Sequence, residues 1–135
     1  LENASSYINE FIKQQLKRFN LSPDKVALVG FSQGTMLSLH IAPRQNKQFA
    51  CVVGFSGILV GCDALAEKCK TKPPICLIHG DADEVVDVKF TKLARDCLTE
   101  NNFVVENLIC SGLGHSIDND GLLFATKFLQ KHLIK

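Results

Sequence analysis

The sequence predicts a single α/β domain with a mostly parallel sheet and flanking helices. Two observations indicate this fold. Short, nearly all-apolar runs alternate along the chain with longer segments whose apolar residues recur at the helical period. The chain also has 135 residues and no internal repeat, low-complexity tract or linker, so residues 1–135 are expected to form one domain.

The first half of the chain is expected to contribute two helices and two strands. Residues 6–19 are apolar at the helical period with charges between them, and Asn20 suits the end of that helix. After a turn at 21–24, residues 25–31 form a nearly all-apolar strand. A helix is expected at 35–42, where Pro43 stops it, and the next strand at 51–55.

The second half repeats this alternation. Residues 58–72 form an excursion with one short helical turn around 63–68, and a strand follows at 75–79. Residues 88–99 are amphipathic and predict a helix. A fourth strand is expected at 103–109 and a closing helix at 122–133. Strands that alternate with helices predict β-α-β units and a parallel sheet buried on both faces.

Charge and hydropathy exclude two classes of partner. The net charge is +1 and no long basic run occurs, so we expect no nucleic-acid binding. No apolar stretch has the length of a membrane span, and the first residues lack a signal-peptide core. The chain begins at Leu1 and its only methionine is Met36, so we expect a trimmed chain or part of a longer one.

The six cysteines are expected to be reduced. No C-x-x-C pair is present to bind zinc, and most of the cysteines lie in or beside predicted strands or on an apolar helix face. We therefore predict small, mostly buried thiols in a cytoplasmic protein, with no metal site.

A G-x-S-x-G pattern marks the first candidate site. Ser32 lies between Gly30 and Gly34, directly after an apolar strand and at the start of a predicted helix. In that setting the pattern is the nucleophile elbow of a serine hydrolase. A turn tight enough to lift the serine above the sheet brings backbones together, and glycine tolerates that approach.

A serine nucleophile needs a base and an acid that orients the base. Both are expected in loops that follow strands, because ligands gather at the carboxyl ends of parallel strands. His115 lies in the loop after the fourth predicted strand. The loop after the third offers several carboxylates, and the residues alone leave the choice open among Asp81, Asp83, Glu84 and Asp87. This loop lacks the glycine and glutamate of a calcium-binding loop.

These segments resemble the phospholipase/carboxylesterase family, the α/β-hydrolase group that contains acyl-protein thioesterases and small bacterial carboxylesterases. The matching motifs are Gly30-Phe31-Ser32-Gln33-Gly34, Phe55-Ser56-Gly57, His79-Gly80-Asp81-Ala82-Asp83-Glu84-Val85-Val86 and Gly112-Leu113-Gly114-His115. The resemblance implies a catalytic triad of Ser32, Asp83 and His115, with the backbone N–H of Gln33 in the oxyanion hole. It implies a small acyl ester or thioester as substrate, and no cofactor.

The resemblance covers only the C-terminal part of that fold. The opening strands, and the loop that supplies the other oxyanion donor, are absent, so a truncated α/β-hydrolase fold with weak or no activity is expected. The strand from Val26 to Gly30 would then be an exposed apolar edge, which predicts a homodimer or an N-terminal partner piece. Asp87 stands where the family usually has proline and suits a helix N-cap.

Four further residues are candidates for substrate binding. Phe31, Met36 and Leu113 flank the motifs and line an acyl pocket or belong to the core, and Ser56 is expected on the floor of the site. His79 is expected to shape the acidic loop rather than to transfer protons. Two alternatives stay open: a non-catalytic hydrolase-derived fragment that acts as a binding or assembly module, and a peptidase on the same fold.

Overall fold

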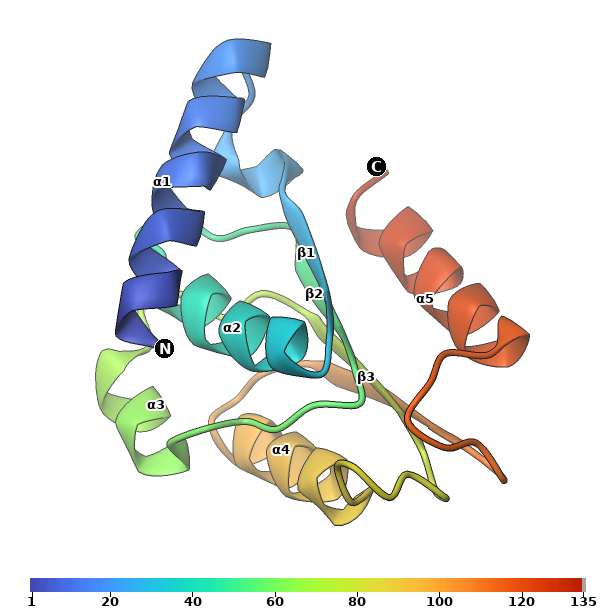
Figure 1. Ribbon diagram of the computed structural model, residues 1–135. Helices are drawn as coiled ribbons and strands as arrows, with labels where there is room; N and C mark the ends of the chain where they lie inside the picture. The colour runs from blue at the N-terminus through green and yellow to red at the C-terminus, as the bar shows by residue number, and fades with distance from the viewer. Residues whose placement is uncertain (135) are drawn as a thin grey trace.

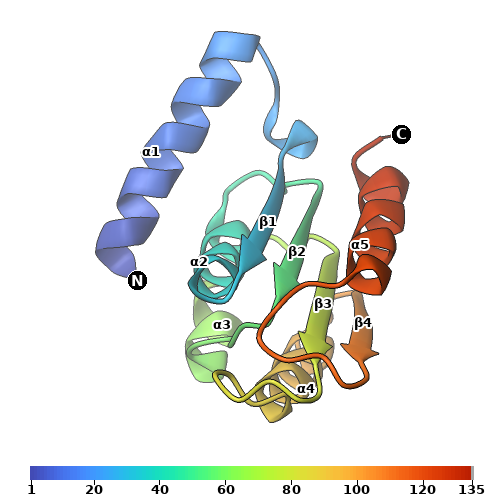
Figure 2. The same ribbon diagram turned by 45° about the vertical axis from the view of Figure 1, so that its right-hand side comes forward.

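A four-stranded parallel sheet forms the centre of the molecule. The computed structural model describes residues 1–134, and its strands lie in the order β1-β2-β3-β4, all parallel, with their arrowheads at one end (Figure 2). Their bounds are Ala27–Phe31 for β1, Cys51–Phe55 for β2, Ile75–Gly80 for β3 and Val105–Cys110 for β4. The predicted α/β fold with a parallel sheet is confirmed.

Helices cover both faces of the sheet unequally (Figure 1). Four helices lie on one face and α5 lies alone on the other. The helices are α1 (Glu2–Phe19), α2 (Gln33–Ile41), α3 (Cys62–Lys68), α4 (Lys89–Glu100) and α5 (Asn119–His132), with 3-10 turns at Pro23–Lys25 and Ala42–Arg44. All the expected elements are present, with ends that differ by a few residues.

Two hydrophobic clusters form the core, one on each face of the sheet. The cluster beneath α5 covers β2, β3 and β4, where α5 makes its sheet contacts. On that face of β1, Ala27 packs against the cluster, but Val29 is 56% exposed and Phe31 40% exposed. The end of β1 at Val29 and Phe31 therefore presents exposed apolar surface on this face.

A disulfide bond corrects the expectation that all six cysteines are reduced. Cys62 at the start of α3 is bonded to Cys97 of α4, and their Cα atoms lie 6.2 Å apart. The two residues are 35 positions apart, and only the packing of α3 beside α4 brings them together. Burial raises the pKa of Cys76 to about 12 and that of Cys110 to about 11, so these two remain thiols. Across residues 1–134, no helix combines the length and the apolar character needed to cross a membrane.

Candidate active site

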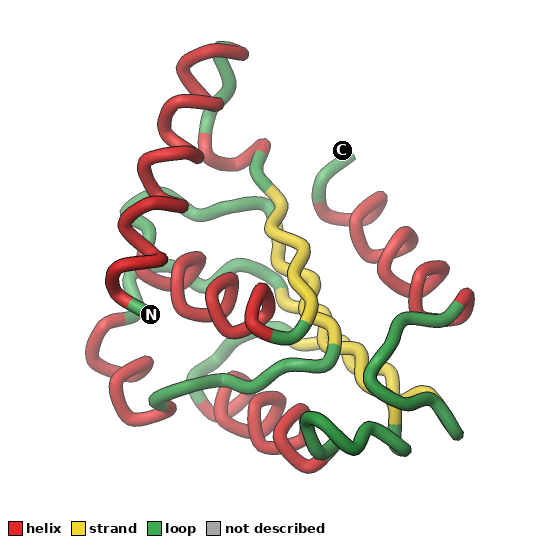
Figure 3. Tube along the Cα trace, viewed as in Figure 1, coloured by secondary structure: helices red, strands yellow, loops and turns green. Residues whose placement is uncertain are grey.

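The predicted site residues all follow strands at the same edge of the sheet. Ser32 follows β1, Asp83 lies beyond β3, and His115 lies beyond β4. The loops after β3 and β4 run side by side (Figure 3), and the N–H of Ala82 donates to the carbonyl of Leu113 across them. Parallel topology alone therefore gathers the three side chains on one rim.

Ser32 occupies a strained turn between β1 and α2. Its φ of 55° and ψ of −111° lie outside the regions that non-glycine residues favour. A Cβ on Gly30 would lie 2.3 Å from the Gly34 carbonyl carbon, so glycine is required at Gly30. At Gly34 a Cβ would meet nothing within 4 Å, so the second glycine of the motif is not required by contact.

The first turn of α2 is fastened to β2 through one carbonyl. The Phe55 oxygen accepts from the Ser32 N–H at 2.9 Å and from the Thr35 hydroxyl at 2.7 Å. Thr35 is buried and its side chain fills the space that Gly54 and Gly57 leave on β2 and beyond it. This threonine was not identified from the sequence, where nothing distinguishes it from any other helical residue.

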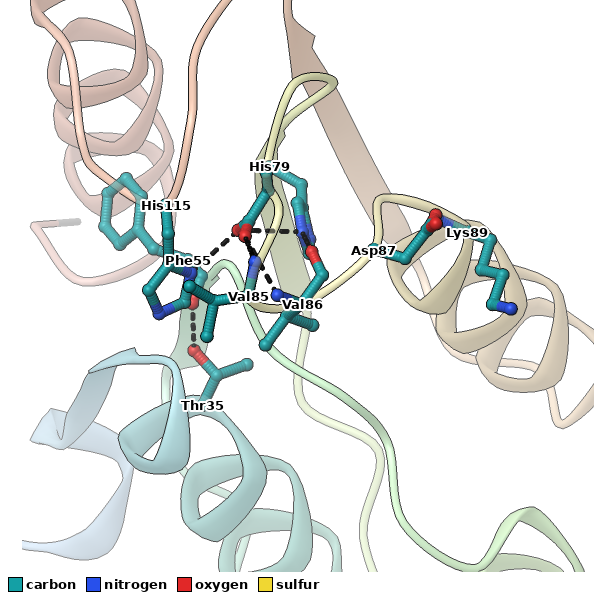
Figure 4. Close-up of polar contacts among 9 residues, drawn as sticks. Thr35, Phe55, His79, Val85, Val86, Asp87, Lys89 and His115 are labelled. Atoms are coloured by element: carbon teal, nitrogen blue, oxygen red, sulfur yellow. Dashed lines mark hydrogen bonds and ion pairs between the residues drawn. The ribbon is translucent and has the colours of Figure 1, made fainter.

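Asp83 is a buried carboxylate with a complete set of donors. Its Oδ1 accepts from the backbone N–H groups of Val85 at 2.8 Å and Val86 at 2.9 Å, and its Oδ2 lies 2.7 Å from Nδ1 of His115 (Figure 4). Burial raises the pKa of Asp83, but the hydrogen bonds from Val86, His115 and Val85 outweigh it, so the pKa lies below its ordinary value. Asp83 is therefore ionised at neutral pH.

The other three carboxylates of the acidic loop do not contact His115: Asp81 and Asp87 accept backbone hydrogen bonds, and Glu84 is exposed. Asp81 accepts from the N–H of Gly112 at 2.7 Å and so ties the two loops together. Asp87 accepts from the N–H of Lys89 at 2.9 Å, but the N-cap of α4 is Val88, which makes no side-chain capping bond, so the expected cap at Asp87 is wrong. Glu84 is exposed. Of the four candidates that the residues left open, Asp83 is the one that contacts His115.

His115 lies between Asp83 and Phe31, the residue before Ser32. Its ring lies 4.8 Å from the ring of Phe31, centroid to centroid, and its side chain is 19% exposed. A Cβ on Gly80 would lie 2.1 Å from the Leu113 oxygen, so glycine there lets the His115 loop pack against the end of β3. Because Nδ1 faces a carboxylate, it carries the proton, and Nε2 is left as an acceptor. Within the described residues, the Ser32 hydroxyl makes no hydrogen bond to this ring.

The remaining predicted residues lie at or near the same rim. Gln33 is the first residue of α2, so its N–H has no partner inside the helix. Ser56 directly follows β2, with φ of 52°, and is 1% exposed. Met36 is half-buried, and Leu113 packs against the cluster beneath α5. A cavity of about 550 Å³ lies between Ile58 and α4, and none of the predicted lining residues borders it, so the acyl pocket stays a prediction.

A parallel sheet with a serine on a strained strand-to-helix turn, and a buried acid–imidazole pair beyond two other strands, defines the α/β-hydrolase fold. Comparison with protein families agrees, since residues 1–133 match the family described as Phospholipase/Carboxylesterase. The chain belongs to this family.

Known relatives and solved structures are longer than this chain. The acyl-protein thioesterase 1 homolog 1 of Dictyostelium discoideum is 27% identical over all of this chain and 61% of its own length. Esterase YpfH of Escherichia coli is 31% identical over 90% of this chain and 51% of its own length. The crystal structure of esterase PE8 superposes with a TM-score of 0.95 at 36% identity, over 98% of this chain and 61% of that one. The chain thus spans about half to two thirds of its relatives, as a truncated fold requires.

Proposed function

We propose that this chain carries the catalytic residues of a carboxylic ester or thioester hydrolase. Ser32 would be the nucleophile, His115 the general base and Asp83 the acid that orients it. The observation that supports this most is the 2.7 Å hydrogen bond between buried Asp83 and His115, on the rim where Ser32 sits in a strained turn. The named thioesterase and esterase relatives support the same reaction class.

The proposed chemistry follows from the protonation of His115. Nε2 accepts the Ser32 proton as the hydroxyl oxygen attacks the ester or thioester carbonyl, and Asp83 stabilises the imidazolium that forms. The oxyanion faces the Gln33 N–H at the start of α2, where the helix dipole also favours negative charge. His115 then protonates the leaving alcohol or thiol. Water, deprotonated by the same imidazole, releases the acyl group and restores Ser32.

Weak turnover is proposed for the 135-residue chain alone. Gln33 supplies one oxyanion donor, and loss of one such donor typically lowers turnover by about 10²–10³. The part of the fold that the relatives have beyond the matched region is the proposed source of the second donor. A slow enzyme whose serine nevertheless reacts is therefore the expected behaviour.

An active-site probe tests this proposal. A fluorophosphonate, which phosphonylates a serine activated by a base, is expected to label the chain, while a short acyl ester is hydrolysed slowly. Ser32→Ala should lose the label and Ser111→Ala, at an exposed serine just after β4, should keep it. Absence of labelling in the wild-type chain would favour the non-catalytic binding or assembly module. Cleavage of an amide as fast as an ester would favour a peptidase.

The free edge of β1 supports a second proposal, on partners. We propose that it pairs with a β-strand from the N-terminal part of the fold, supplied by a separate or preceding segment. Among residues 1–134, β1 pairs with β2 alone, and two grooves of about 350 and 260 Å³ between α1 and β1 flank the unpaired edge. Val29 and Phe31 are exposed there, whereas β4 at the other edge has no exposed residue: its first five residues are half-buried and Cys110 is buried. Unpaired apolar edges recruit strands.

Mixing tests which strand occupies the edge. The chain and the unmatched part of esterase PE8 are expected to form a one-to-one complex by light scattering, with a gain in ester turnover of about 10²–10³. Val29→Lys should weaken the complex, while Val104→Lys, at an exposed valine beside β4, should not. Either a monomer that stays monodisperse in the mixture or pairing only between two copies of the chain would overturn the proposed occupant.

We also propose a cytoplasmic location. Four cysteines lie outside the disulfide, which supports a reducing compartment. The Cys62–Cys97 bond weighs against it, because disulfides persist mainly in oxidising compartments.

A further inference from the structure

His79 is a buried imidazole directly behind the acid of the proposed triad. It lies in β3 and is 1% exposed. Its Nε2 lies 2.7 Å from the carbonyl oxygen of Val86 and 3.3 Å from Oδ2 of Asp83 (Figure 4). The triad mechanism assigns no role to this ring.

The partners of the ring define its protonation. A carbonyl oxygen can only accept, so Nε2 of His79 carries a hydrogen, and this N–H is shared between Val86 and Asp83. Nδ1 is buried and has no hydrogen-bond partner among residues 1–134. A second proton at Nδ1 would be a buried donor without an acceptor. Within the described residues, His79 therefore donates only from Nε2.

The Nε2–H group of His79 contacts both the Asp83 carboxylate and the Val86 peptide that binds it. Val86 donates its N–H to Oδ1 of Asp83 and accepts from His79 through its carbonyl. On the other side, Oδ2 of Asp83 lies between His79 and His115, at 3.3 and 2.7 Å. Movement of the His79 ring would release the Val86 peptide and one face of the carboxylate together.

We propose that His79 is a positioning residue that holds the Asp83 carboxylate in the orientation required to bind Nδ1 of His115. This inference rests on the proposed function of Asp83 and His115 as a catalytic pair. In this role His79 touches no substrate. Its removal should slow the acylation of Ser32 and leave the KM for a short acyl ester nearly unchanged.

Two substitutions separate the hydrogen bond from the volume of the ring. His79→Leu removes the donor. In His79→Gln the amide nitrogen is as many bonds from Cα as Nε2 is, so the donor is kept. We expect the rate of fluorophosphonate labelling of Ser32 to fall by about 10- to 100-fold in the leucine variant and to recover most of the wild-type rate in the glutamine variant.

A second readout does not depend on activity. The Nδ1 proton of His115, bound to a carboxylate at 2.7 Å, should give a far-downfield proton NMR resonance. Its loss in Asp83→Asn and in His115→Gln would assign it. The resonance should persist in His79→Gln and broaden or move upfield in His79→Leu. If wild-type labelling fails, the proposed function fails, and this resonance still tests the role of His79.

A folded His79→Leu variant with unchanged resonance and unchanged labelling would overturn the proposal, as would a glutamine variant no better than the leucine one. If His79→Leu does not fold, His79→Asn replaces it, because its shorter amide reaches only the Nδ1 position and not Asp83. The asparagine variant should then behave as the donor-free one, and full labelling and an unchanged resonance there would also overturn the inference.

Discussion

Asp83→Asn is expected to slow the labelling of Ser32 by about 10⁴-fold without unfolding the chain. The reason is the fixed direction of the side chain. Two backbone N–H groups, from Val85 and Val86, point at Oδ1, so the amide oxygen of asparagine must take that place. The amide NH₂ then faces Nδ1 of His115 and requires it to be an acceptor. The ring proton moves to Nε2, which can no longer accept the Ser32 proton.

Asp81→Asn is the matched control for this result. Asp81 lies in the same loop and uses one carboxylate oxygen to accept from the N–H of Gly112. An asparagine oxygen can accept that bond equally well, so labelling should stay within a few-fold of the wild type. The fluorophosphonate labelling rates of Asp83→Asn and Asp81→Asn, measured in parallel, test this difference. Equal loss in the two variants would show that the loop, and not the orientation of His115, controls the reaction.

The wild type and Asp83→Asn also test the ionisation of Asp83. A carboxyl whose pKa is lowered on folding contributes stability above its unfolded pKa, about 3.9, and loses it as the pH falls through the folded value. The wild type should therefore lose its advantage in unfolding free energy over Asp83→Asn below about pH 4. Denaturant unfolding at neutral pH and in acid measures this, and a difference that does not change with pH would contradict it.

The fold was predictable from the chain because its two central strands, β2 and β3, are buried on both faces. Every residue of Cys51–Phe55 is buried, and the predicted and observed bounds of that strand agree. Helix ends were less predictable because they depend on local bonds. α5 begins at Asn119, where Asp118 accepts from the N–H of Gly121, whereas the apolar pattern begins only at Leu122. Phe103 was assigned to a strand, but its N–H is bonded to Leu98 in the turn after α4.

The site was predictable as far as topology determines it. Loops that follow parallel strands share one edge, so Ser32, an acid and His115 were expected near one another. The choice of acid depends on the turn around Asp83, which residue types alone do not specify, and there the family resemblance was needed. His79 was expected to shape the acidic loop, but its contact with Val86 could not be predicted, since it depends on that loop folding back onto β3.

Reduction of the Cys62–Cys97 disulfide is expected to lower the free energy of unfolding by about 3–4 kcal/mol, given a closed loop that spans 35 positions. The bond restricts the unfolded chain, and in the folded chain it joins α3 to α4. Equilibrium unfolding in denaturant, with and without dithiothreitol, measures the effect. Cys62→Ser, at the exposed end of the bond, should lower the stability by a similar amount and abolish the sensitivity to reductant.

Cys69→Ser provides the control for that measurement. Cys69 lies just beyond α3, where its thiol contacts the carbonyl of Thr71, and it takes no part in the disulfide. This variant should keep the full response to reductant.

Both bonded cysteines also border the cavity of about 550 Å³ beside α4. Reduction should therefore increase the local motion of α3 and α4 around this cavity before the sheet unfolds. Thiol alkylation that modifies Cys62 and Cys97 in the native, unreduced chain would show that the bond does not form, and the predicted loss of stability would disappear with it.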